Sequence, residues 1–274
     1  MVQYLFPALV RGILVALVIL IPTLVLPDVT FEGRQMAMIV ALIAFVIVLF
    51  EYGSSHPGLV EFRFAPPFNR IRFLCLLATV LGIALLFRGA AMPDTASTFV
   101  LRAGIVLGQA LDFPFSPVRL MVAALSDGTD PIREQLILAS TGLAYAVSLI
   151  MLAVLSIMIR LLDWPLGSSR FNILVNLPIF DPLAESDVAA HLERDARANI
   201  TFGFFLPFLM PVMAVGVADV HNLATIETEQ PLLWSVTFWA FLPASLFMRG
   251  IAFLRLAQVL RSQRVPVALE RPAS

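Results

Sequence analysis

The sequence predicts an all-α protein: a polytopic transmembrane helical bundle of about six spans, with an added re-entrant or interfacial helical hairpin. Of its 274 residues, 59% are hydrophobic and only 14% are charged, whereas soluble domains carry about 25% charged residues. Six apolar segments are also long enough to cross the roughly 30 Å hydrocarbon core of a bilayer. These observations favour a multispanning membrane protein over a soluble globular domain.

The expected spans follow from the six apolar segments. They cover approximately residues 5–26, 36–52, 71–87, 136–162, 200–218 and 232–248. The first segment has the basic residue and apolar core of a signal peptide, but Pro22 and Pro27 close it and no small-residue cleavage pattern follows. We therefore interpret it as a retained span.

The arginines orient the bundle. All 18 basic residues are Arg, and short cytoplasmic loops of membrane proteins carry the excess of basic residues. If the loop between the second and third spans is cytoplasmic, most arginines share its side, and the other side receives only Arg34, Arg88, Arg102, Arg119 and Arg133. This distribution predicts a multi-pass protein of the bacterial plasma (inner) membrane with both termini in the cytoplasm.

The loop between the second and third spans contains the basic stretch EFRFAPPFNRIRF at residues 61–73. We expect Arg63, Arg70 and Arg72 to contact lipid phosphates or a protein partner, because a guanidinium is permanently charged and binds oxyanions through two parallel hydrogen bonds. The phenylalanines among them are expected at the lipid head-group boundary. Trp164, at the inner end of the fourth span, is expected at the same interface.

Residues 98–125 are apolar but interrupted by charged residues and prolines. A single crossing here would reverse everything that follows and place the C-terminal arginines outside the cell. We therefore predict a periplasmic hairpin with arms at about 98–111 and 118–125. Arg102 and Asp112 are polar groups on this hairpin that need partners at membrane depth, so they are candidates for packing or gating.

Two cytoplasmic segments complete the expected topology. The linker at 163–199 is expected to hold a short amphipathic helix that begins near Asp181 and includes Leu192. The basic tail at 249–274 is expected to continue the last span as a helix to about Arg264.

Few residues carry recognisable chemistry. In the fifth span, Pro207 and Pro211 each remove a backbone hydrogen bond, which produces either a movable gate or a static kink. After that span, Asp219 and His221 are weak candidates for metal ligands, although their spacing matches no metal motif and a solvated acidic loop is the simpler interpretation. No catalytic residue, cofactor-binding residue or cofactor is predicted.

Three function classes remain open. The favoured hypothesis is a non-catalytic accessory, scaffold or assembly factor of a larger membrane complex, because the span interiors contain almost no ionisable residues. A small transporter or channel with a proline-kinked fifth span is one alternative, and an enzyme at the membrane surface is another. The expected partners are the lipid bilayer and a membrane-protein complex. The net charge of −1 gives no indication of nucleic-acid binding.

Overall fold

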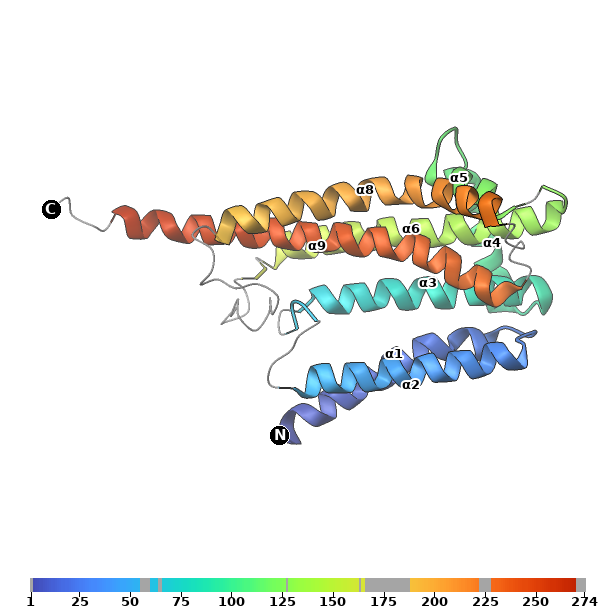
Figure 1. Cartoon of the computed structure of the whole chain (residues 1–274), viewed down its shortest axis with the longest axis horizontal. Helices are drawn as coiled ribbons and strands as arrows, with labels where there is room; N and C mark the ends of the chain where they lie inside the picture. Colours follow the sequence, from blue (N-terminus) through green and yellow to red (C-terminus); the bar gives the residue numbers. More distant parts are fainter. Residues whose placement is uncertain are drawn as a thin grey trace.

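The computed structural model describes residues 2–54, 60–63, 66–126, 128–162, 164–165, 188–221 and 228–269. For residues 2–4, 216–221 and 263–269 it describes the backbone only. Within these ranges the chain forms eight α-helices and no strand (Figure 1). The helices are α1 (Val2–Val25), α2 (Phe31–Gly53), α3 (Phe68–Ala91), α4 (Thr95–Leu111), α5 (Pro117–Leu125), α6 (Pro131–Leu161), α8 (Val188–His221) and α9 (Glu229–Leu269).

Six of these helices, α1, α2, α3, α6, α8 and α9, are long and apolar enough to cross a membrane. This finding confirms the predicted all-α, multispanning bundle, and each expected span overlaps one of the six. The long helices extend along the long axis of the molecule, so their ends gather at two ends of the bundle (Figure 1). We call the end where α2 finishes and α3 begins the arginine end, and the other the opposite end.

Three helices form the centre of the bundle. In their apolar segments, 56% of the residues of α9, 44% of α3 and 39% of α6 are buried, against 22% of α1 and α8 and 17% of α2. The α1–α2 pair forms one flank, in which α1 packs on α3, while α8 packs along α9 (Figure 1). The three least buried helices therefore present long apolar faces to the bilayer.

The predicted hairpin consists of α4 and α5, joined at residues 112–116. The Asp94 carboxylate accepts the N–H of Ser97 at 3.1 Å, and the Ser97 hydroxyl accepts the N–H of Asp94 at 3.1 Å, which forms a capping box at the start of α4. The hydrogen bond from the Ser97 backbone is the main reason that the pKa of the Asp94 carboxyl lies below its usual value. The Ser116 hydroxyl caps α5 by accepting the N–H of Arg119 at 3.0 Å.

Glycines bring α4 and α6 into backbone contact. A Cβ atom at Gly142 would lie 2.3 Å from the Cα of Gly108, and a Cβ atom at Gly108 would lie 2.6 Å from the carbonyl oxygen of Leu138. Small residues allow membrane helices to approach this closely. The hairpin is therefore a packed part of the bundle and contacts α3 and α8 as well.

The last two spans are longer than the sequence predicts. α8 already includes residues 188–199, which we assigned to the linker, and runs without a break into the fifth span. This segment is rich in alanine and other good helix formers and contains neither Gly nor Pro. The expected helix start at Asp181 lies outside the described residues. α9 continues as a helix to Leu269, as predicted for the basic tail.

The glycine contact gives a stability prediction. Gly142→Ala should lower the free energy of unfolding by about 1–3 kcal/mol, because the new methyl group must displace the α4 backbone. The measurement is unfolding of the purified chain by SDS titration in mixed micelles. Gly53→Ala is the matched control, since a Cβ atom there meets no atom of the described residues within 4 Å. Equal stability of the two variants would contradict the close α4–α6 contact.

Candidate functional site

The arginine end brings together side chains from six separated parts of the chain. Tyr52, at the end of α2, lies between two guanidinium groups: that of Arg11 from α1 is 4.5 Å from its ring centroid and that of Arg63 is 5.3 Å away. Such cation–π contacts stabilise a cation where water is scarce. The loop that follows α2 thus folds back onto the helix ends.

Arg63 closes this loop. Its Nη1 donates to the carbonyl oxygens of Glu51 (2.7 Å) and Ser54 (3.0 Å), and its Nη2 donates to the carbonyl of Tyr52. These are carbonyl groups at the end of α2, which no further helical turn can satisfy. The Glu51 carboxylate in turn accepts the N–H of Val60 at 2.8 Å. Because Arg63 is only 7% exposed, its guanidinium mainly contacts groups of the protein itself.

Four aromatic rings pack beneath the loop. Phe62 lies 4.7 Å from Phe68, 5.3 Å from Trp164 and 5.8 Å from Phe253, measured between ring centroids. Phe62, Phe68 and Trp164 are all buried within the protein, so these three rings pack against one another and do not contact lipid head groups directly. Burial of Phe62 is accompanied by a backbone φ of 54°, a left-handed conformation that non-glycine residues rarely adopt.

An ion pair connects the same loop to α9. The Glu61 carboxylate accepts two hydrogen bonds from Arg249, at 2.6 and 2.7 Å. Arg249 also donates to the Asn199 side chain on α8 at 3.2 Å and lies 4.7 Å from the ring centroid of Phe253. The Glu61 side chain is 10% exposed and that of Arg249 is 32% exposed. Bidentate, partly buried pairs of this kind fix geometry strongly.

The two other arginines of the loop differ in their surroundings. Arg72, in the first turns of α3, donates to the Ser245 hydroxyl on α9 at 2.7 Å and lies 5.5 Å from the ring centroid of Phe68. Its Nε is buried and has no hydrogen-bond partner among the described residues. Arg70 is exposed. Among the three arginines expected to contact lipid or a partner, Arg70 therefore has the accessibility that this role requires.

The prolines of the fifth span face the centre of the bundle. Pro207 and Pro211 are both buried. Pro211 has no N–H to offer to the carbonyl of Pro207, one helical turn earlier, and the indole Nε1 of Trp239 on α9 donates to that carbonyl instead, at 2.9 Å. The hydrogen bond satisfies the group exposed by the proline and holds α8 against α9. This geometry favours the static kink over the gate.

The remaining candidates lie on α4, in the turn after it and in the last turns of α8. Arg102 is exposed on α4, and Asp112 pairs with Arg119 at 2.7 Å. That ion pair raises the pKa of Arg119. Asp219 and His221 belong to the last turns of α8, but their side chains lie outside the described set.

Several residues that hold the arginine end together were not singled out by the sequence. They are Glu51, Glu61, Asn199, Ser245 and Arg249. Glu61 is the one acidic residue in the basic stretch 61–73, which could have indicated an internal ion pair. Its partner could not have been chosen from the sequence, because Arg249 lies 188 residues further along the chain.

The polar groups at the arginine end connect separate helices of the protein to one another. Its carboxylates and guanidinium groups bind each other, backbone carbonyls and hydroxyl groups. In the described part of the chain, no three His, Cys, Asp or Glu side chains are grouped to hold a metal ion. Comparisons with protein-family models, with curated proteins and with solved structures give no match for this chain.

The Glu61–Arg249 pair can be tested against a more exposed pair between α8 and α9. Glu61→Gln should lower the free energy of unfolding by about 2–4 kcal/mol, because it leaves a partly buried guanidinium without its counter-charge. Glu193→Gln should change it by at most about 1 kcal/mol, since its partner Arg261 is 56% exposed. SDS titration measures both. Similar losses of unfolding free energy in both variants would show that the Glu61–Arg249 pair stabilises the fold no more than the exposed pair does.

The Trp239 hydrogen bond gives a double-mutant test. Trp239→Phe should lower the free energy of unfolding by about 1–2 kcal/mol, because it leaves a buried carbonyl unsatisfied. In a Pro211→Ala background the same substitution should cost less, because the alanine N–H can bond to the Pro207 carbonyl. The four unfolding free energies form a thermodynamic cycle. Additive effects would mean that the indole does not compensate for Pro211.

Proposed function

We propose that this chain is a non-catalytic accessory, scaffold or assembly protein of a larger membrane complex. The observation that supports this most is the use of the polar groups at the arginine end. Arg63, Arg249 and Arg72 each bind groups of the chain itself, so these side chains stabilise a fixed arrangement of helices and are not arranged around an open site.

We further propose that the protein lies in the bacterial inner membrane with the arginine end in the cytoplasm. The positive-inside rule supports this orientation, since the arginine end holds Arg63, Arg70, Arg72 and Arg249. Both termini would then be cytoplasmic. Arg70, the exposed member of the loop, is the residue we propose for contact with lipid phosphates or a cytoplasmic part of the partner.

The surface that we propose for the partner is the outward face of α8. Gly203, Pro207 and Pro211 occupy its inward face, which leaves the opposite face to large apolar side chains. Those more than 45% exposed are Phe202, Phe204, Phe205, Leu209, Val212 and Met213. The rings of Phe204 and Phe205 meet edge to face, with centroids 5.1 Å apart. Paired aromatic rings offer rigid contact area that a neighbouring helix can fill.

Gentle purification of the tagged chain, followed by intact-complex mass measurement, tests this proposal. The wild-type chain should carry a partner protein in fixed stoichiometry. The Phe204→Ala, Phe205→Ala double variant should retain it at least about tenfold less, which corresponds to a loss of about 1.4 kcal/mol of binding free energy. Phe238→Ala, on α9, removes a similarly exposed ring, with 57% exposure, and should retain the partner.

A different outcome would contradict the proposal. If the purified chain is free of partners and catalyses solute flux in liposomes, the transporter hypothesis replaces the accessory one. Loss of that flux in Trp239→Phe would then assign the kink of α8 to gating. Equal retention of the partner by all variants would reject the α8 face as its binding surface.

A further inference from the structure

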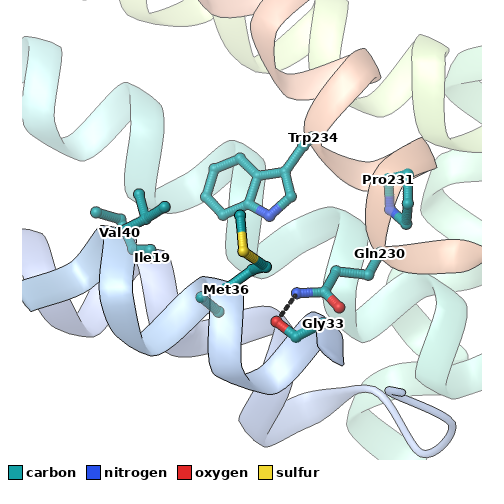
Figure 2. A pocket seen from close by; sticks show the side chains of 8 residues that line it. Ile19, Gly33, Met36, Val40, Gln230, Pro231 and Trp234 are labelled. Carbon is teal, nitrogen blue, oxygen red and sulfur yellow. Dashed lines mark hydrogen bonds between the residues drawn. The ribbon is translucent and has the colours of Figure 1, made fainter. Parts of the chain in front are cut away.

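A cavity of about 440 Å³ lies at the opposite end of the bundle, between the α1–α2 pair and the start of α9 (Figure 2). None of the residues that line it is charged. They are Ile19, Gly33, Met36, Ala37, Val40, Gln230, Pro231 and Trp234. On the α2 side the wall is open to the surroundings of the bundle, because Met36 is 60% exposed and Val40 is 47% exposed.

Two polar groups of the cavity lie at its shallow end, and a third, the indole N–H of Trp234, lies one turn further along α9 (Figure 2). Gly33 and Gln230 lie in the first turns of α2 and α9, and the Gln230 amide donates to the Gly33 carbonyl across a long 3.4 Å hydrogen bond (Figure 2). A Cβ atom at Gly33 would lie 2.4 Å from the Gln230 Oε1, so the glycine makes room for the amide. Deeper along α2 the lining is Met36 and then Val40, both apolar.

Charged residues adjoin the shallow end of the cavity, which we call its mouth. Glu229 adjoins Gln230 in the sequence, and its carboxylate lies close enough to Asp28 to interact unfavourably and close enough to Arg133 to interact favourably. Glu32 and Arg34 adjoin Gly33 in the sequence. Groups of both signs therefore lie near this end, where a further cation would relieve the repulsion between Asp28 and Glu229.

We propose that this cavity binds one acyl chain of a zwitterionic phospholipid whose head group carries a primary ammonium. The hydrocarbon lies along Met36 and Val40, the ester carbonyl meets the Gln230 amide, and the head group lies among the charges of the mouth. This order of polarity, from charged through polar to apolar, follows the order found in a bilayer leaflet. The site is independent of the partner surface on α8.

Size and charge set this occupant apart from others. A single turn of α-helix fills roughly 400–600 Å³ by its diameter and pitch, so the cavity has room for about one turn at most and not for a membrane-spanning partner helix. The uncharged lining excludes a ligand whose charge must be buried. An anionic phospholipid would add a negative charge, and no positive one, to a mouth where Asp28 and Glu229 already repel each other in the presence of Arg133.

Native mass spectrometry of the full-length chain tests the site. The chain is incubated in detergent with equal amounts of phosphatidylethanolamine and phosphatidylglycerol, then stripped of loosely bound lipid. The wild type should retain one phosphatidylethanolamine. Val40→Trp, which fills the cavity, should abolish retention, and Gln230→Leu should reduce it about threefold, the effect of one hydrogen bond in a membrane protein.

The matched control is Ile47→Trp. Ile47 lies two turns further along α2, is 49% exposed and does not line the cavity, so this variant should retain lipid like the wild type. Circular dichroism confirms that each variant folds. The proposal is overturned if no lipid remains on the wild type, if both phospholipids are retained equally, if Val40→Trp retains lipid as Ile47→Trp does, or if an extracted isoprenoid quinone occupies the chain instead.

Discussion

The bidentate ion pair between Glu61 and Arg249 is the contact on which the arrangement of the arginine end depends. A guanidinium near hydrocarbon needs a counter-charge or hydrogen-bond acceptors, and here the loop after α2 supplies both. Glu61 binds Arg249 of α9. The adjacent Phe62 packs in an aromatic cluster that includes Trp164. Arg63, the next residue, binds the carbonyls at the end of α2. Three consecutive residues thereby fix the relative positions of α2, α9 and the end of α6. The left-handed backbone of Phe62 is understandable in this setting, because it lets neighbouring side chains point toward different helices.

Packing in the rest of the bundle depends on small residues, which let helices approach closely, and on side-chain hydrogen bonds that replace missing backbone ones. Gly108 and Gly142 bring α4 onto α6, and Gly203 brings α8 onto α9, where a Cβ atom would lie 2.8 Å from the Pro243 carbonyl. The α1–α2 pair has no comparable contact with α9. It is connected there through Gln230 and Gly33, and the space beside this weak hydrogen bond is the cavity. A flank attached mainly through α1 and α3 leaves a gap beside α9, so the same packing accounts for both the rigid centre and the cavity proposed to bind lipid.

The sequence predicts the features that depend on local composition, and it fails where distant residues meet. Hydropathy identifies the spans because a bilayer demands about twenty apolar residues per helix, and the polar interruptions near Asp112 mark the turn between α4 and α5. The sequence predicts a helix around Leu192 but not its continuity with the fifth span, because hydropathy reports only the apolar part of a helix. Residues 188–199 continue α8 as an amphipathic segment that buries Ala189, Leu192 and Ala196. Trp164 and Phe62 were placed at the interface because a ring near a span end usually lies there. Their burial depends on Phe253, about ninety residues beyond Trp164, which no local pattern reveals.

The same distinction bears on function. Two prolines four residues apart signal a weakened helix, and from the sequence alone both a gate and a static kink are consistent with it, the static kink being the favoured interpretation. The structure adds the fact that separates them, a donor on α9 placed at the carbonyl that Pro211 leaves free. A gate at this position would have to break that hydrogen bond within the apolar centre of the bundle, where no water replaces it. Buried prolines with a satisfied carbonyl therefore shape α8, and they turn its aromatic face outward. A fixed helix with an outward aromatic face is the property expected of a surface that binds another protein in the membrane, and this is the physical reason for preferring an accessory role over transport.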